Sequence, residues 1–351
     1  MRLEFIDNVK ENEVLGKSIL TYDGKILLRS GNLLTFSYIE KLKDLGVDYI
    51  YIEDDRLYDI DLEDEKLTKL KQNTIKSISN IVKNISSNRR LEVREDIREV
   101  ENLVEYILEN KDVNTSLYDI KTYDNYTYVH CLDTGIMATF LAMSLKISKE
   151  KVKELAIGAI LHDVGKVKVP HKIISKNGRL TDAEFDEIKK HPLYGREILE
   201  KKFSSSKIIL NTVAQHHERV DGRGYPYGLK SNEISRYGKI AAICDVYDAV
   251  SSDRCYRRKF SPNEAYELIL GGSGTAFDED LVDTFKKTFS IYPLGCKLLL
   301  SNGIEGYVCS QNKEFPDRPI IRVFPGGSMQ NSLYYEMDLL KFSNITVVKV
   351  V

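Results

Sequence analysis

The first 61 residues alternate between short apolar runs and turn signals. Residues 18–21 and 25–28 flank Asp23-Gly24, a dipeptide typical of the tight turn in a β-hairpin. Apolar residues then recur at helical spacing over 36–45, and Gly46 stands where a glycine often ends a helix. A run with strand composition follows over 49–52. The pattern predicts a small N-terminal α/β module over residues 1–61.

Residues 62–114 are rich in charge, contain no proline and carry apolar side chains three or four positions apart. This spacing predicts a linker of two amphipathic helices. The apolar faces could form a homodimer seam, or they could pack against the main domain of the same chain. The apolar positions are Ile75, Ile78, Val82, Ile85, Val93, Ile97, Val100, Val104 and Ile107.

Helical periodicity continues through most of residues 115–290, with clear runs at 134–145, 151–161 and 261–270. After residues 292–295 the pattern changes to short β-like runs separated by turn signals such as Asn302-Gly303. The chain is therefore predicted to be mainly α, with a helical bundle over 115–290 and a small β module over 291–351.

Composition narrows the class of protein. A chain of 351 residues is too long for one ordinary domain, and 42% apolar with 30% charged residues is typical of soluble globular proteins. The formal net charge of -2 provides no general field for DNA or RNA, so neither is expected as a partner. No apolar stretch reaches the length of a membrane span, and Glu4 interrupts any signal-peptide pattern, so we expect a cytoplasmic protein.

The five cysteines are an odd number, widely spaced and without a C-x-x-C pair. That arrangement is typical of reduced thiols that behave as small apolar core residues.

Histidines and aspartates in the helical region form the strongest chemical signal. Imidazole nitrogen combined with carboxylate oxygen suits iron, manganese, cobalt or zinc, and a helical bundle can direct such side chains inward from several helices. A lone histidine is usually a core or surface residue, and His171, which has no acidic neighbour, is interpreted that way. The pairs His162-Asp163 and His216-His217 are hard to explain by packing, because buried imidazoles need polar partners. The candidate ligands are His130, His162, Asp163, His191, His216, His217 and Asp245, and Asp163 could bridge two ions.

Three further segments could contact a phosphorylated substrate. Lys166 follows His162 by one helical turn and could present an ammonium to a phosphate, unless it is simply a solvated lysine. The glycine-rich loop 221–228 could place Tyr225 near a substrate base, although it could also be an ordinary connection. Arg254 and Arg257 lie in a run of three arginines that suits bidentate phosphate contacts or stacking on guanine, although such runs are usually solvated.

These residues carry a resemblance to a known family. The segment 162–166, His-Asp-Val-Gly-Lys, is similar to the H-D-x-G-K signature of the HD phosphohydrolase superfamily. The segment 216–226, which begins with His-His-Glu and ends with Gly-Tyr-Pro, resembles the signature of its HD-GYP branch. Matching segments at 180–184, 191–195, 245–249 and 252–257 follow in the expected order, so the resemblance covers about half of the chain.

The resemblance implies an α-helical HD-type bundle that hydrolyses cyclic di-GMP, a bacterial second messenger, or a related cyclic dinucleotide. It implies two divalent metal ions, iron or manganese, with a water between them. One ion would take His130, His162, Asp163 and Asp245, and the other would share Asp163 and take His191, His216 and His217. Asp163 and Lys166 would be catalytic. Substrate would be held by Lys166, Gly224, Tyr225, Pro226, Arg254 and Arg257.

Two positions depart from the family pattern. Cys255 stands where a proline is usual, and Tyr126 stands where some members place a glutamate that helps to bind a third metal. Two metals are therefore expected. Two other functions stay open: a catalytically weak receptor for the dinucleotide, and a hydrolase of a hybrid cyclic dinucleotide. A protein partner could bind the GYP loop or the N-terminal module.

Overall fold

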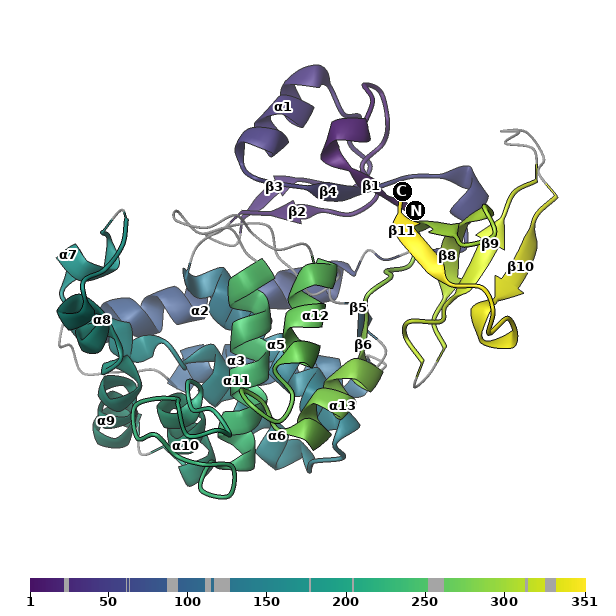
Figure 1. The fold of residues 1–351 in the computed structure, drawn as a ribbon. Coiled ribbons are helices and arrows are strands. Elements are labelled where there is room, and N and C mark those ends of the chain that lie inside the picture. Colours follow the sequence, from purple (N-terminus) through teal and green to yellow (C-terminus); the bar gives the residue numbers. More distant parts are fainter. Residues whose placement is uncertain are drawn as a thin grey trace.

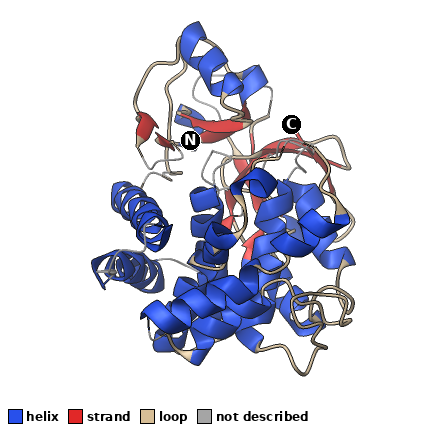
Figure 2. Ribbon diagram, turned by 90° about the vertical axis from the view of Figure 1, so that its left-hand side faces the viewer, coloured by secondary structure: helices blue, strands red, loops and turns tan. Residues whose placement is uncertain are grey.

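A helical bundle forms the larger body of the protein. The N-terminal module lies above it in both Figure 1 and Figure 2, and the C-terminal module lies at the upper right of Figure 1. The computed structural model describes residues 1–21, 25–60, 62, 64–86, 94–110, 115–116, 127–176, 178–203, 205–251, 262–312, 315–325 and 333–351. The predicted mainly α fold, with a small α/β module at one end and a β module at the other, is confirmed.

The N-terminal module contains the predicted hairpin, helix and strand, preceded by a further strand. Its elements are β1 (Arg2–Phe5), β2 (Ile19–Leu20), β3 (Ile26–Leu28), α1 (Phe36–Asp44) and β4 (Tyr49–Ile52). Strands β2 and β3 form the hairpin, and β1 pairs antiparallel with β4. Helix α1 begins after Thr35, whose side chain accepts a hydrogen bond from the backbone of Tyr38. It ends before Gly46, which has the positive φ of 74° that favours glycine at that position.

The linker consists of the two long helices α2 (Glu65–Ser86) and α3 (Arg94–Asn110), which pack against each other and against the bundle. Their apolar faces join the same hydrophobic core as the bundle helices. These core residues are Ile75, Ile78, Ile81 and Ile85 of α2 with Val100, Leu103, Val104 and Ile107 of α3. Much of the predicted apolar stripe is thus covered by the chain's own main domain. Val93 lies outside the described residues.

Helix α5 is the centre of the bundle. It is predominantly apolar and is covered by α6, α11, α13 and both linker helices, as expected for a helix that is buried nearly all round. The bundle helices are α5 (Thr127–Ser144), α6 (Lys149–Ile160), η3 (Val164–Lys168), α7 (His171–Ile174), α8 (Asp182–Ile188), α9 (His191–Phe203), α10 (Lys207–Gln215), α11 (Arg236–Ser251), α12 (Pro262–Gly271) and α13 (Glu279–Thr288). The first turn of α8 is fixed by a reciprocal capping box between Thr181 and Glu184.

The C-terminal module is an antiparallel sheet with strand order β10-β9-β8-β7-β11. Its strands are β7 (Lys297–Leu300), β8 (Glu305–Ser310), β9 (Ile320–Val323), β10 (Tyr335–Asp338) and β11 (Val347–Val350), and a short parallel pair, β5 (Thr115–Ser116) with β6 (Phe289–Ser290), precedes it. The sheet shares its hydrophobic core with the N-terminal module, because Leu3 and Tyr51 pack with Leu298 and Ile321. Across the described residues, no helix combines the length and apolar character needed to cross a membrane.

Candidate metal centre

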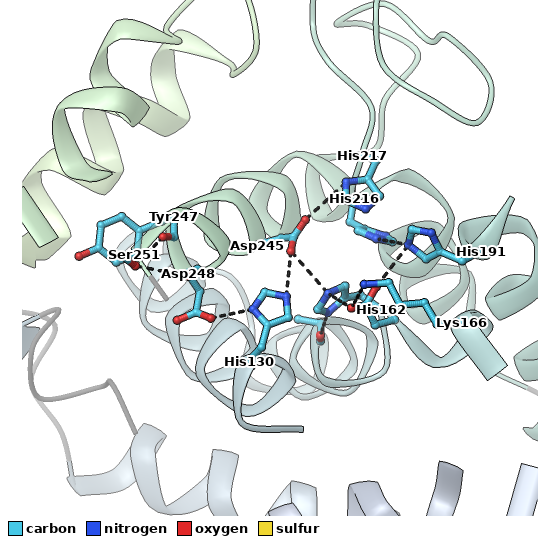
Figure 3. A network of polar contacts seen from close by, with 12 residues as sticks. His130, His162, Lys166, His191, His216, His217, Asp245, Tyr247, Asp248 and Ser251 are labelled. Atoms are coloured by element: carbon cyan, nitrogen blue, oxygen red, sulfur yellow. Dashed lines mark hydrogen bonds and ion pairs between the residues drawn. The ribbon is translucent and has the colours of Figure 1, made fainter. Parts of the chain in front are cut away.

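The seven predicted ligands come together in the bundle, although they are spread over more than a hundred positions of the sequence, and Figure 3 labels all of them except Asp163. His130 projects from α5 and Asp245 from α11, two helices that pack side by side. The other ligands lie at helix ends. The His162-Asp163 pair follows α6, His191 begins α9, and the His216-His217 pair follows α10. At a helix end two adjacent side chains can face one centre, whereas within a continuous helix adjacent side chains point in different directions.

The ligands form two compact groups. Possible donor atoms of His130, His162 and Asp245 lie within 4.8 Å of one another, and so do those of His191, His216 and His217. Asp163 lies between the groups: its Oδ2 is 3.5 Å from His162 Nε2, and its Oδ1 is 3.3 Å from His191 Nε2. The Asp163 carboxylate therefore contacts both groups.

Backbone carbonyl groups orient three of the imidazoles. His162, His191 and His216 each direct Nδ1 at the carbonyl oxygen three residues earlier, at 2.6, 2.7 and 2.8 Å. A carbonyl oxygen only accepts hydrogen bonds, so Nδ1 carries the proton and Nε2 presents a lone pair to the centre. The loop geometry at each helix end therefore selects the tautomer that binds a metal.

Two nitrogen lone pairs then face each other without a proton between them. His191 Nε2 lies 3.2 Å from His216 Nε2, and both rings are oriented by carbonyl groups through Nδ1. His162 Nε2 is buried and has no hydrogen-bond partner among the described residues. Buried polar atoms without partners are costly in free energy, and a cation between them would remove that cost. The residues present therefore fit a metal centre.

The protonation states also suit metal binding. Burial lowers the pKa of His162 and of His216, and it lowers the pKa of His217 to about 3. Although burial alone would raise the pKa of Asp163, Lys166 and the neighbouring imidazoles hold it well below the ordinary value. Neutral imidazoles and ionised carboxylates are the forms that bind metal ions.

His130 differs from the other imidazoles. Its Nε2 lies 3.0 Å from Asp245 Oδ1, and its Nδ1 lies 2.6 Å from Asp248 Oδ2. Burial opposes the charged ring, but the hydrogen bonds to these two carboxylates raise the pKa of His130 to about 9. The same contact with His130 helps to hold the pKa of Asp245 well below its ordinary value, against the effect of burial. Without a metal, His130 therefore carries a proton that a cation would replace.

Lys166 lies at the rim of the centre. Its Nζ is 2.5 Å from Asp163 Oδ2, and its side chain is 31% exposed. Segment η3, which carries it, packs tightly on the start of α9 because Gly165 has no side chain. A Cβ atom there would stand 1.9 Å from the carbonyl oxygen of His191 and 2.4 Å from the amide nitrogen of Gly195. The glycine of the H-D-x-G-K segment thus brings His162-Asp163 and His191 together.

The loop 221–228 folds back over the histidine pair. The Tyr225 amide donates to the carbonyl oxygen of His217 at 3.1 Å, and the two rings lie 4.6 Å apart between centroids. Gly224 permits this approach, because a Cβ would stand 2.4 Å from the amide nitrogen of Arg219. Glu218 is 3% exposed and accepts hydrogen bonds from the amides of Tyr227 and Leu229 at 2.7 and 2.9 Å. Because Tyr225 contacts His217, the Gly-Tyr-Pro segment, in which Pro226 follows Tyr225, borders the group of His191, His216 and His217.

Several residues at the centre were not predicted as functional. Asp248 orients His130, and Glu218 holds the loop 221–228. Both lie inside the segments that resemble the family, 245–249 and 216–226, but neither was predicted to have a role. Cys131 is buried as predicted for the cysteines, but it lies with His162 and Asp163 in a third group of possible ligands. The spacing of three residues between Asp245 and Asp248 on one helix was the available signal for Asp248.

Other predicted residues stand apart or cannot be located. His171 is exposed and contacts Ser175, the residue that follows its helix α7, and it is in none of the ligand groups. Arg254, Arg257, Cys255 and Tyr126 lie outside the described residues.

Comparison with known proteins gives a consistent result. A model of the HD domain family matches residues 103–281. Among curated proteins, a cyclic di-GMP phosphodiesterase of Pseudomonas aeruginosa is 36% identical over 218 residues, which are 62% of this chain and 52% of that protein. A 3'3'-cGAMP-specific phosphodiesterase of Vibrio cholerae is 33% identical over 168 residues, which are 48% of this chain and 36% of that protein. The chain thus spans about half the length or less of these relatives.

A solved structure has the same fold. It is that of Bd1817, a HDG"Y"P protein from Bdellovibrio bacteriovorus, which superposes with a TM-score of 0.53 at 17% identity and covers 81% of this chain and 97% of its own. Because the family model matches more than half of the residues, the chain belongs to the HD domain family.

Proposed function

We propose that this protein is a metal-dependent phosphodiesterase that hydrolyses a cyclic dinucleotide in bacterial signalling, with cyclic di-GMP as the first candidate substrate. The observation that carries the proposal is the pair of largely buried ligand groups with Asp163 between them, in which Nε2 of His191 and Nε2 of His216 face each other 3.2 Å apart. The choice of substrate class is supported by the two curated relatives, which are named as phosphodiesterases of cyclic dinucleotides.

The centre would hold two divalent ions, iron or manganese, because five imidazoles and two carboxylates form a donor set between hard and soft. One ion would bind His130, His162, Asp163 and Asp245, and the other would bind Asp163, His191, His216 and His217. When bound, two such ions lower the pKa of a shared water, neutralise the phosphodiester and stabilise the departing oxygen.

Side chains around the centre would bind and orient the substrate. Lys166, at the rim, would exchange part of its contact with Asp163 for a contact with the scissile phosphate. Tyr225 would support a base of the substrate beside His217, with Gly224 and Pro226 fixing the loop. Arg254 and Arg257 would bind phosphate or stack on guanine, as bidentate and planar guanidinium groups can.

Two ions per chain, and not three, are proposed because Tyr126 replaces the glutamate that would complete a third site. A phenol with a reference pKa near ~10 is a poor ligand for a divalent cation. Anomalous scattering at the metal edge tests this count. Two fully occupied peaks near the seven ligands are expected, and a third peak, or a Tyr126 oxygen at bonding distance, would contradict the proposal.

The substrate is tested with the purified protein, reconstituted anaerobically with Fe²⁺ or Mn²⁺ and incubated with a panel of cyclic dinucleotides. We expect cyclic di-GMP to be opened to the linear dinucleotide or to GMP. The hybrid cyclic GMP-AMP is the second candidate substrate, because the chain is similar to a cGAMP-specific enzyme. Faster cleavage of this dinucleotide than of cyclic di-GMP would make it the preferred substrate. If the protein bound a dinucleotide but formed no product, it would be a receptor and the proposed enzymatic activity would be wrong.

Assembly and location stay predictions. A homodimer through residues 62–114 would have to use surfaces that α2 and α3 do not bury against the bundle. A protein partner could bind the loop 221–228 or the N-terminal module, and a cytoplasmic location is expected. Analytical ultracentrifugation of the full chain tests the dimer, with a single monomeric species as the contradicting result.

A further inference from the structure

His130 is held between two carboxylates from one helix. Asp245 and Asp248 stand one turn apart on α11, and they contact opposite nitrogens of the ring that α5 presents (Figure 3). The Asp245 oxygen lies 3.0 Å from Nε2, and the Asp248 oxygen lies 2.6 Å from Nδ1. Asp248 is 1% exposed, so the contact is shielded from water.

The contrast with the other rings gives Asp248 a chemical role. Neutral carbonyl groups orient His162, His191 and His216, whereas a carboxylate orients His130. A carboxylate behind an imidazole fixes the ring and increases the donor strength of its opposite nitrogen. His130 is therefore the strongest imidazole donor among these four.

The two ligand groups consequently differ in charge. The group of His130, His162 and Asp245 includes one carboxylate and has the Asp248 carboxylate behind it. The group of His191, His216 and His217 contains only imidazoles, and the second oxygen of Asp245 lies 3.5 Å from His217 Nδ1 at its edge. Asp163 faces each group with one oxygen, and the ammonium of Lys166 at the rim contacts the oxygen that faces His162. A divalent cation is attracted more strongly to the first group, because the interaction of opposite charges is only weakly screened in a buried site.

We propose that Asp248 is a positioning residue that makes the His130 group the tighter of two unequal metal subsites, so that the first ion enters there. The inference rests on the metal centre of the proposed function and is independent of which dinucleotide is cleaved. The second ion binds to the three imidazoles and completes the pair.

Titration of the metal-free full-length protein with Mn²⁺ tests this order, followed by electron paramagnetic resonance and calorimetry. Wild type should bind in two steps: a mononuclear signal up to one equivalent, then an exchange-coupled signal up to two. Asp248→Asn should weaken the first step by about 10- to 100-fold, the usual effect of losing such an outer partner. As a matched control, Asp278→Asn removes a carboxylate that pairs with Lys239 elsewhere in the bundle, and it should leave both steps unchanged.

A second pair of variants keeps the test decisive if Asp248→Asn does not fold. His217→Ala should lose the second step and retain the first, whereas His130→Ala should lose the first. The inference is overturned if Asp248→Asn leaves the first step unchanged, or if His217→Ala abolishes the first step while His130→Ala spares it. Ordered binding of two ions by a protein that cleaves no cyclic dinucleotide would refute the proposed function alone. Reversed order in an active enzyme would refute this inference alone.

Discussion

Glu218 offers a test of how the loop 221–228 is held over the metal centre. Its buried carboxylate accepts the amide protons of Tyr227 and Leu229 at 2.7 and 2.9 Å. Substitution by alanine removes both acceptors and leaves the loop attached through fewer contacts, such as the hydrogen bond from Tyr225 to His217. We therefore expect the Glu218→Ala loop to open more often while the bundle stays folded.

The size of the effect follows from the two hydrogen bonds. Bonds to a charged group contribute about 1.5–3 kcal/mol each, so their sum is about 3–6 kcal/mol. Tyr227 is 45% exposed, and water can replace part of the loss. Local opening should then become easier by about 2–4 kcal/mol, and the two amides should exchange about 30- to 700-fold faster. Hydrogen-exchange mass spectrometry of the segment 219–230 measures this change, and the Michaelis constant should rise with it.

Two further variants make the reasoning refutable. Glu218→Gln keeps the shape and one oxygen, so its exchange should lie between those of wild type and Glu218→Ala. Glu233 also accepts a backbone amide, from Lys230 at 2.8 Å, but on the exposed surface of the same region. Glu233→Ala should change exchange by less than about threefold, because water replaces an exposed hydrogen bond readily. Equal exchange in Glu218→Ala and Glu233→Ala would show that the buried carboxylate does not hold the loop.

Three other predictions concern protons, packing and substrate. Burial lowers the pKa of three imidazoles, that of His217 to about 3, so the folded metal-free protein binds fewer protons than the unfolded chain below pH ~6.5. His130, with its raised pKa, has the opposite effect near pH 7 but is protonated in both states at pH 5, so the Tm of chelator-treated protein should fall mainly between pH ~6.5 and pH 5, and a constant Tm would contradict this. Gly165→Ala should lower the free energy of unfolding by about 1–3 kcal/mol, because the added methyl group overpacks against α9, and it should reduce the amount of bound metal. Gly271→Ala should change neither, because its added methyl group would meet no atom within 4 Å. Arg254→Ala should raise the Michaelis constant without changing metal content, and loss of metal in that variant would exclude a substrate role.

The clustering of the candidate ligands could be predicted from the sequence because their chemistry is local. His162-Asp163 and His216-His217 are unusual neighbours, and each pair lies at a helix end where two side chains can share a direction. The helical bundle was predictable for a similar reason, since the periodicity of 134–145 and 151–161 reflects burial within single helices.

Features that depend on long-range packing could not be predicted. The role of Asp248 depends on how α11 lies against α5, which sequence spacing alone does not give. Strand β1 forms because residues 2–5 pair with 49–52, and β10 has the sequence Tyr-Glu-Met-Asp, which lacks a clear strand pattern. The core shared by the N-terminal and C-terminal modules likewise joins the two ends of the sequence.

The central claim is tested most directly by the rate of cyclic di-GMP hydrolysis before and after metal removal. Wild type, His162→Ala and Asp163→Ala are each stripped with a chelator, reconstituted anaerobically with Mn²⁺ or Fe²⁺, and assayed with parallel determination of bound metal. We predict that linear dinucleotide or GMP forms only in the reconstituted wild type, because each substitution removes a proposed ligand of the proposed two-metal centre. Hydrolysis at the same rate in stripped wild type, or near-normal turnover by either variant with full metal content, would contradict the claim.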